Sequence, residues 1–156
     1  DYIRMRAIHD HGGIYIDTDV EVIKNFDPLL SNACFMGYES IGRATTGVLG
    51  GIAGHEFMKQ CMEIIDDRHE RNLPYLIAPK VAQIAAEKIK TKDLHIYPEA
   101  YFYPYNPYDP ARPSVGLMYR DIRPETFAIH HWGKSWGKPD GNWARRIIRK
   151  LNQFIK

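Results

Sequence analysis

Two carboxylates one residue apart, Asp17 and Asp19, are the side chains best suited to chemistry. They directly follow the apolar stretch "GGIYI" at positions 12–16. If the strand continues through both residues, side-chain alternation places the two carboxylates on one side of it. Adjacent like charges favour a bound cation, and carboxylate oxygens prefer Mg²⁺ or Mn²⁺ to zinc or copper. The pair therefore predicts a divalent metal site whose remaining coordination positions suit a phosphate.

Two other D-x-D chemistries follow the same pattern. An EF-hand loop beginning at Asp17 would need Gly and Glu where this sequence has Val22 and Pro28, which excludes it. An aspartyl-phosphoenzyme phosphatase stays open as an alternative. Such enzymes resemble the pattern D-x-D followed two residues later by Thr or Val, whereas this sequence has Glu21 at that position. The plainest alternative is a pair of solvated residues that end a strand.

The elements around the pair indicate an α/β fold. Helical spacing or stop signals predict helices over 1–13, 54–71 and from Pro79 to about Ile89, and a basic amphipathic helix over 143–156. Short apolar runs predict strands at 14–17, 34–39, 45–54, 94–97 and 126–132, with a proline-rich loop at 101–113. In the last strand His130 and His131 point to opposite faces, so only one of them can face the site.

Composition limits the possible partners and compartments. The 156 residues suit a single domain spanning 1–156, and the net charge of +2 is too small to indicate nucleic acid. Two cysteines without C-x-x-C spacing fit a reducing compartment, so we expect a cytoplasmic protein. The helix over 143–156 could dock peripherally on the inner face of an anionic membrane, or its apolar stripe could pack on the domain itself.

Residues 1–22, "DYIRMRAIHDHGGIYIDTDVEV", resemble the signature of the sugar-transferase region containing a DXD motif. This is glycosyltransferase family 32, which includes yeast-type initiating mannosyltransferases and bacterial capsule and lipopolysaccharide glycosyltransferases. The stretches "GYE", "GHEF", "IYPEAYFYP" and "IHHWGKSW" follow in the order that the family shows. The resemblance thus covers nearly the whole chain.

The resemblance implies a GT-A fold, a Rossmann-like nucleotide-diphospho-sugar transferase, that transfers sugar with retention of anomeric configuration. It implies a nucleotide-sugar donor, with a UDP-sugar favoured, and a divalent metal, usually Mn²⁺. By motif position, the residues assigned to donor or metal are Asp1 and Arg4 (donor sugar), Tyr15 (nucleotide), Asp17 (ribose, sugar and metal), Asp19 and His130 (metal), Ser135 and Trp136 (diphosphate) and Lys134 (leaving-group charge). Arg4, Asp17 and Asp19 are the candidate catalytic residues.

We therefore expect a metal-dependent retaining glycosyltransferase of surface or capsular polysaccharide synthesis, acting on a glycan or lipid-linked acceptor. The abrupt start inside a helix predicts that the first GT-A strands are missing and that 1–156 is the larger, C-terminal part of the catalytic domain. A catalytically idle fragment that only binds nucleotide-sugar or glycan is a further alternative. Glu39 and Asp121 are candidates for a carboxylate nucleophile or for acceptor binding.

Overall fold

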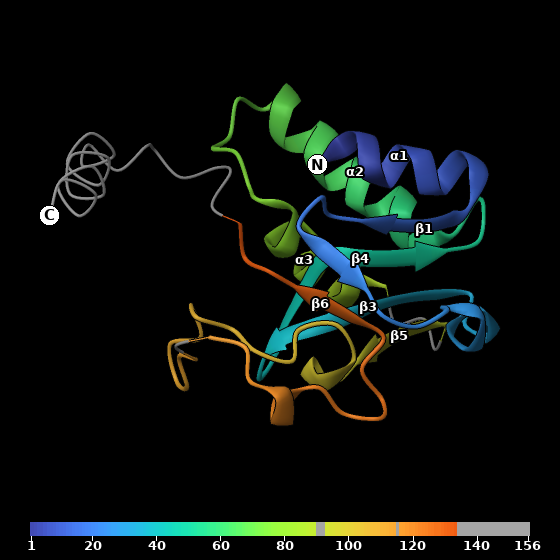
Figure 1. Ribbon diagram of the computed structural model, residues 1–156. Coiled ribbons are helices and arrows are strands. Elements are labelled where there is room, and N and C mark those ends of the chain that lie inside the picture. Colours follow the sequence, from blue (N-terminus) through green and yellow to red (C-terminus); the bar gives the residue numbers. More distant parts are fainter. Residues whose placement is uncertain (90–92, 115, 134–156) are drawn as a thin grey trace, which may run out of the picture.

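A computed structural model describes residues 1–89, 93–114 and 116–133 (Figure 1). The helices are α1 (Tyr2–His11), α2 (Glu56–Glu70) and α3 (Ala78–Lys88). The strands are β1 (Gly13–Ile16), β2 (Val20–Val22), β3 (Cys34–Ser40), β4 (Arg43–Gly51), β5 (Leu94–Tyr97) and β6 (Ala128–His130). Short 3-10 turns occupy Asp27–Ser31, Glu99–Tyr101 and Tyr119–Asp121.

Four strands form one mixed sheet in the order β1-β4-β3-β5. The β1–β4 and β3–β4 pairs are antiparallel, whereas β3 and β5 are parallel. A separate two-stranded antiparallel ribbon pairs β2 with β6, opposing Val20 to His130. This ribbon brings the late histidine next to the carboxylates that immediately precede β2.

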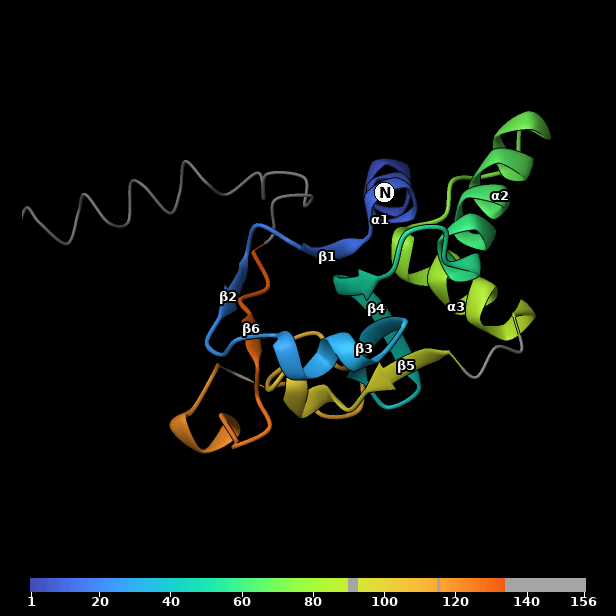
Figure 2. The same ribbon diagram turned by 90° about the vertical axis from the view of Figure 1, so that its right-hand side faces the viewer.

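The sheet separates two apolar layers. All three helices lie on one side of it, and the β2–β6 ribbon lies on the other (Figure 2). Alternation along β3 divides the core accordingly, because Cys34 and Met36 pack among the helices while Phe35 packs toward the ribbon side. In β4, Leu49 and Val48 make the same division. The sheet therefore carries a buried layer on each face.

The predicted α/β class and most of the predicted elements are confirmed. Helix α1 ends where Gly12 adopts a φ of 68°, a left-handed conformation that glycine accepts without strain. The predicted helices over 54–71 and from Pro79 correspond to α2 and α3, and both cysteines are buried and free, as expected. No described helix combines the length and the apolar character that a bilayer crossing requires. The predicted helix over 143–156 lies outside the described residues.

One local prediction is wrong. The strand does not run through the carboxylate pair: β1 ends at Ile16, and the chain turns over Asp17–Asp19 before β2 begins. The Val20 N–H donates to the Asp17 carbonyl at 3.0 Å and closes this turn. Asp-Thr-Asp is rich in turn-forming side chains, and their local preference prevails over continuation of the apolar run. The last strand is likewise shorter than predicted, covering Ala128–His130 only.

Candidate functional site

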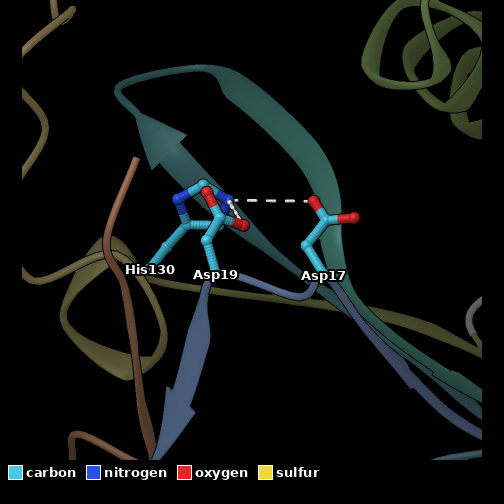
Figure 3. A group of neighbouring side chains, drawn as sticks. All are labelled: Asp17, Asp19 and His130. Carbon is cyan, nitrogen blue, oxygen red and sulfur yellow. Dashed lines mark ion pairs between the residues drawn. The ribbon is translucent and has the colours of Figure 1, made fainter. Parts of the chain in front are cut away.

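The turn after β1 and the end of β6 bring three potential metal ligands together. Asp17, Asp19 and His130 each offer one ligand atom, and these atoms lie within 4.8 Å of one another. His130 Nε2 lies 3.7 Å from Asp17 Oδ2 and 3.4 Å from Asp19 Oδ1, and the three side chains converge in Figure 3. Although the pair does not sit on a strand, the turn still directs both carboxylates to one point.

Each carboxylate uses its other oxygen to bind the protein. Asp17 Oδ1 accepts hydrogen bonds from the Tyr15 hydroxyl at 2.7 Å and from the Arg4 guanidinium at 3.1 Å. Asp19 Oδ2 accepts from the Gly133 backbone N–H at 2.7 Å. These donors fix the orientation of the carboxylates and leave Asp17 Oδ2 and Asp19 Oδ1 facing the imidazole. Outer hydrogen bonds of this kind hold ligands in place in protein metal sites.

Electrostatics keep the Asp17 carboxylate ionised. Its partial burial opposes ionisation, but His130, the Tyr15 hydroxyl and the Arg4 charge together outweigh burial and lower the pKa of Asp17. Burial, with the hydrogen bond to Asp17 added, raises the pKa of Tyr15 to about 12, so its hydroxyl remains a donor at neutral pH. The guanidinium of Arg4 also lies 4.3 Å from the centre of the Tyr15 ring.

Gly47 of β4 leaves space beside two of the three potential ligands, Asp17 and His130. A Cβ atom there would lie 3.0 Å from Asp17 Oδ2 and 3.0 Å from the Tyr103 hydroxyl, and 3.1 Å from His130 Cδ2. Tyr103 is fully buried and its hydroxyl oxygen accepts the Val48 N–H at 2.9 Å, so this wall is rigid. A side chain at position 47 would therefore crowd Asp17 and His130.

A cavity of about 450 Å³ opens beside the carboxylates. It is lined by residues of α1, the turn, β4 and the start of α3: Asp1, Arg4, Asp17, Thr45, Thr46, Gly47, Tyr75, Ile77, Ala78 and Pro79. Arg4 spans it, because its guanidinium pairs with Asp1 at 3.2 Å and donates to the Thr46 carbonyl at 3.2 Å. The predicted sugar-contacting residues thus line one cavity with Asp17.

Asp1 has structural partners of its own. Its Oδ2 accepts from the Tyr75 hydroxyl and, at 3.1 Å, from the backbone N–H of Ala78, the first residue of α3. An unpaired N–H at a helix start and the positive end of the helix dipole both favour a carboxylate there. Asp1 therefore anchors α3 to α1, while its Oδ1 pairs with Arg4.

The remaining predicted residues separate into two groups. His131, which directly follows β6, points away from the cluster and pairs with Glu21 at 2.8 Å on the exposed side of the ribbon. Glu39 and Asp121 line a second cavity rather than the metal cluster. Lys134, Ser135 and Trp136 lie outside the described residues.

Four residues of the site were not predicted from the sequence. Thr46, Gly47, Tyr75 and Tyr103 reach it from β4 and from two loops. A glycine in mid-strand between Thr46 and Val48 is a sign of close approach by another group, and that sign was available. Tyr75 and Tyr103 were not distinguishable from other loop tyrosines.

Residues 1–36 match the sequence profile of a family described as the glycosyltransferase sugar-binding region containing DXD motif. This part of the chain is therefore similar to the DXD region of glycosyltransferases. Asp17 and Asp19 supply the motif, and the match extends through β1, β2 and the start of β3. This similarity disfavours the aspartyl phosphatase that the D-x-D pattern alone left open.

The chain is also similar to inositol phosphoceramide mannosyltransferase 3 of Schizosaccharomyces pombe. The two are 32% identical over 74 residues, which is 47% of this chain and 18% of the yeast protein. The aligned part is thus less than a fifth of that relative. No solved structure is significantly similar to the chain.

Proposed function

We propose that this DXD glycosyltransferase is a metal-dependent enzyme that transfers a sugar from a nucleotide-sugar donor to a glycan or lipid-linked acceptor. The observation that carries the proposal is the pair of carboxylate oxygens and the imidazole nitrogen that face one another beside a cavity lined by Asp1 and Arg4. The family match supports sugar transfer. The yeast relative is named for inositol phosphoceramide, which supports a lipid-linked acceptor.

The donor set suits Mn²⁺ or Mg²⁺. Asp17, Asp19 and His130 would hold the ion with two hard oxygens and one imidazole nitrogen, a set that manganese accepts. Three protein ligands leave coordination positions that phosphate oxygens can fill. When bound, such an ion stabilises the negative charge that develops on a departing diphosphate.

The chain's own residues would bind and orient the donor. In the cavity beside the cluster, the Arg4 charge and the carboxylates of Asp1 and Asp17 can bind the hydroxyls of a sugar ring. The transfer breaks the bond between the anomeric carbon and the phosphate oxygen and forms one to an acceptor hydroxyl, on the same face of the ring for retention. Tyr15 would position Asp17 rather than exchange a proton, because its pKa is raised to about 12.

The finer features of the proposal rest on the family resemblance. They are the GT-A fold, membership of glycosyltransferase family 32, a UDP-sugar donor and a role in capsule, lipopolysaccharide or other surface polysaccharide synthesis. The roles of Lys134, Ser135 and Trp136 at the diphosphate belong to the same set. A cytoplasmic location, with peripheral membrane contact through residues 143–156, is proposed separately from the cysteine usage and the basic amphipathic pattern of that segment.

Isothermal titration with Mn²⁺ and a panel of UDP- and GDP-sugars tests this function. One donor should bind, and only when Mn²⁺ is present. Asp19→Asn keeps the shape of the side chain but removes its charge, and it should weaken Mn²⁺-dependent donor binding at least about tenfold. Asp67→Asn, on the exposed face of α2, is the matched control and should bind like the wild type.

Three results would count against the proposal. Donor binding that is equal with and without Mn²⁺ would refute the metal requirement, and equal binding by Asp19→Asn would refute the ligand assignment. Phosphate release from sugar phosphates without donor binding would restore the phosphatase. Donor binding without transfer to any acceptor would identify the chain as the idle binding fragment.

A further inference from the structure

A second cavity, of about 280 Å³, lies on the other side of Tyr103 from the metal cluster. Its lining comes from the end of β3, the loop that follows β5 and the turn near residue 121, and it is mostly polar. Glu39, Asn106 and Asp109 are its most buried polar side chains, and Tyr105 and Arg112 complete the wall. None of these residues has a role in the metal cluster or the donor cavity.

The cavity is preformed because Asn106 ties its walls together. This side chain is 6% exposed; its Nδ2 donates to the Glu39 carbonyl at 2.9 Å and its Oδ1 accepts from the Tyr108 N–H at 2.8 Å. The Asn106 carbonyl accepts the Ser114 N–H at 3.0 Å and closes the loop. Asp109, 7% exposed, is held by the Ala111 N–H at 2.9 Å. A buried network of this kind fixes side chains before a ligand arrives.

The two cavities share their dividing wall. The Glu39 carboxylate lines the second cavity and is hydrogen-bonded to Thr45, which lines the donor cavity. Tyr103 lines the second cavity and its hydroxyl approaches Gly47 of the donor cavity. One end of a molecule bound in the second cavity would therefore lie next to a sugar bound in the donor cavity.

The charges of this cavity fit an uncharged ligand rich in hydroxyls. Two of its four carboxylates are paired with arginines: Arg43 pairs with Glu39 at 3.1 Å, and Arg112 lies 4.0 Å from Glu99. Among the described residues, the one cluster that could hold a metal ion is Asp17, Asp19 and His130, so a second cation site does not explain these acids. Carboxylate and amide side chains offer the paired acceptors and donors that neighbouring sugar hydroxyls require.

We propose that this second cavity binds the acceptor, through an uncharged carbohydrate ring, with Glu39 and Asp109 accepting hydrogen bonds from its hydroxyls. The proposal rests on the proposed function, since it assigns the second substrate of the same reaction. Glu39 lies at the end nearest the donor cavity and is a positioning contact for the attacking sugar. Tyr105 offers an aromatic surface to the C–H face of the ring.

Methyl glycosides of mannose, glucose and galactose serve as probes, with the full chain labelled with ¹⁵N and followed by NMR. At least one glycoside should bind at millimolar concentration and shift the side-chain amide signals of Asn106. Glu39→Gln and Asp109→Asn should each weaken this binding about tenfold, because each replaces a charged acceptor by a neutral one. Glu70→Gln, on the exposed end of α2, is the control and should leave binding unchanged.

The same variants separate this inference from the function it rests on. Glu39→Gln and Asp109→Asn should keep Mn²⁺-dependent nucleotide-sugar binding, and saturating donor should not displace the glycoside. The inference fails if no glycoside binds, if neither variant weakens binding, or if donor and glycoside compete. If donor binding is absent while a glycoside still binds in this cavity, the proposed transferase function fails and the carbohydrate site stands.

Discussion

Gly47→Ala is the sharpest single perturbation of the candidate metal site. The added methyl group would lie 3.0 Å from Asp17 Oδ2, 3.0 Å from the Tyr103 hydroxyl and 3.1 Å from His130 Cδ2. Ordinary contacts of a Cβ atom begin near 3.4 Å, so each neighbour must retreat by a few tenths of an ångström. Tyr103 cannot retreat easily, because it is fully buried and bonded to Val48. The displacement therefore falls mainly on the two metal ligands.

The expected effect has two parts. Overpacking beside a rigid buried ring costs about 1–3 kcal/mol of the free energy of unfolding. Displacement of Asp17 and His130 should lower Mn²⁺ affinity about 10–100-fold, the range observed when the supports of metal ligands are disturbed. Urea unfolding measures the first quantity. The loss of the free Mn²⁺ signal in an electron paramagnetic resonance titration measures the second.

Gly116→Ala is the matched control, because a methyl group at Gly116 would have no neighbour within 4 Å. It should change neither stability nor Mn²⁺ affinity. If the folded Gly47→Ala variant binds Mn²⁺ as tightly as the wild type, the assignment of Asp17 and His130 as metal ligands is refuted.

Three further substitutions test separate parts of the site. His130→Gln should weaken Mn²⁺ binding at least about tenfold. The control, His131→Gln, loses only the exposed contact with Glu21 and should bind Mn²⁺ like the wild type. Equal effects of the two substitutions would contradict the assignment of His130. Arg4→Lys keeps the charge, but a lysine cannot reach the oxygens of Asp1, Asp17 and Thr46 together. Urea unfolding should therefore show a free energy of unfolding that is lower by about 1–3 kcal/mol. Wild-type stability would show that these guanidinium contacts are dispensable. Burial raises the pKa of Glu39, so the folded protein favours the protonated Glu39 carboxyl. The stability that this protonated group contributes is complete below the unfolded-state pKa, and it is lost as the pH rises through the raised folded-state pKa. Glu39→Gln should remove this loss from the pH profile of thermal unfolding, and an unaltered profile would contradict it.

Local patterns made much of this fold predictable. The spacing of α1 and the glycines after it, the apolar run of β1 and the amphipathic α2 all depend on neighbouring residues, and the structure has them nearly as predicted. Alternation predicted that His130 and His131 would point to opposite sides, and they do, although β6 ends at His130. At Asp17–Asp19 two local signals competed. The apolar run before them predicted a continuing strand, but the turn preference of Asp-Thr-Asp determined the structure.

The supports of the site were not predictable in this way, because their partners are distant in sequence. Arg4 reaches the Thr46 carbonyl 42 residues away, and Tyr75 reaches Asp1 74 residues away. Such contacts depend on the packing of α1 against α2 and on the antiparallel pairing of β1 with β4, neither of which a single sequence determines. The family resemblance assigned Asp1 and Arg4 to a donor sugar, and the structure adds that Asp1 also anchors α3.

The backbone at Trp132 and Gly133 connects the metal ligands to the segment that follows. The Trp132 N–H donates to His130 Nδ1 at 3.1 Å, and the Gly133 N–H donates to Asp19 Oδ2. A neutral imidazole has one proton, so an accepting Nδ1 leaves it on Nε2. An ion on Nε2 requires the proton on Nδ1, which then cannot accept from Trp132. Trp132 holds a φ of 56°, a conformation that few non-glycine residues adopt, so this hydrogen bond helps to maintain an unfavourable backbone. Ion binding at His130 and the backbone conformation just before Lys134 are therefore thermodynamically coupled.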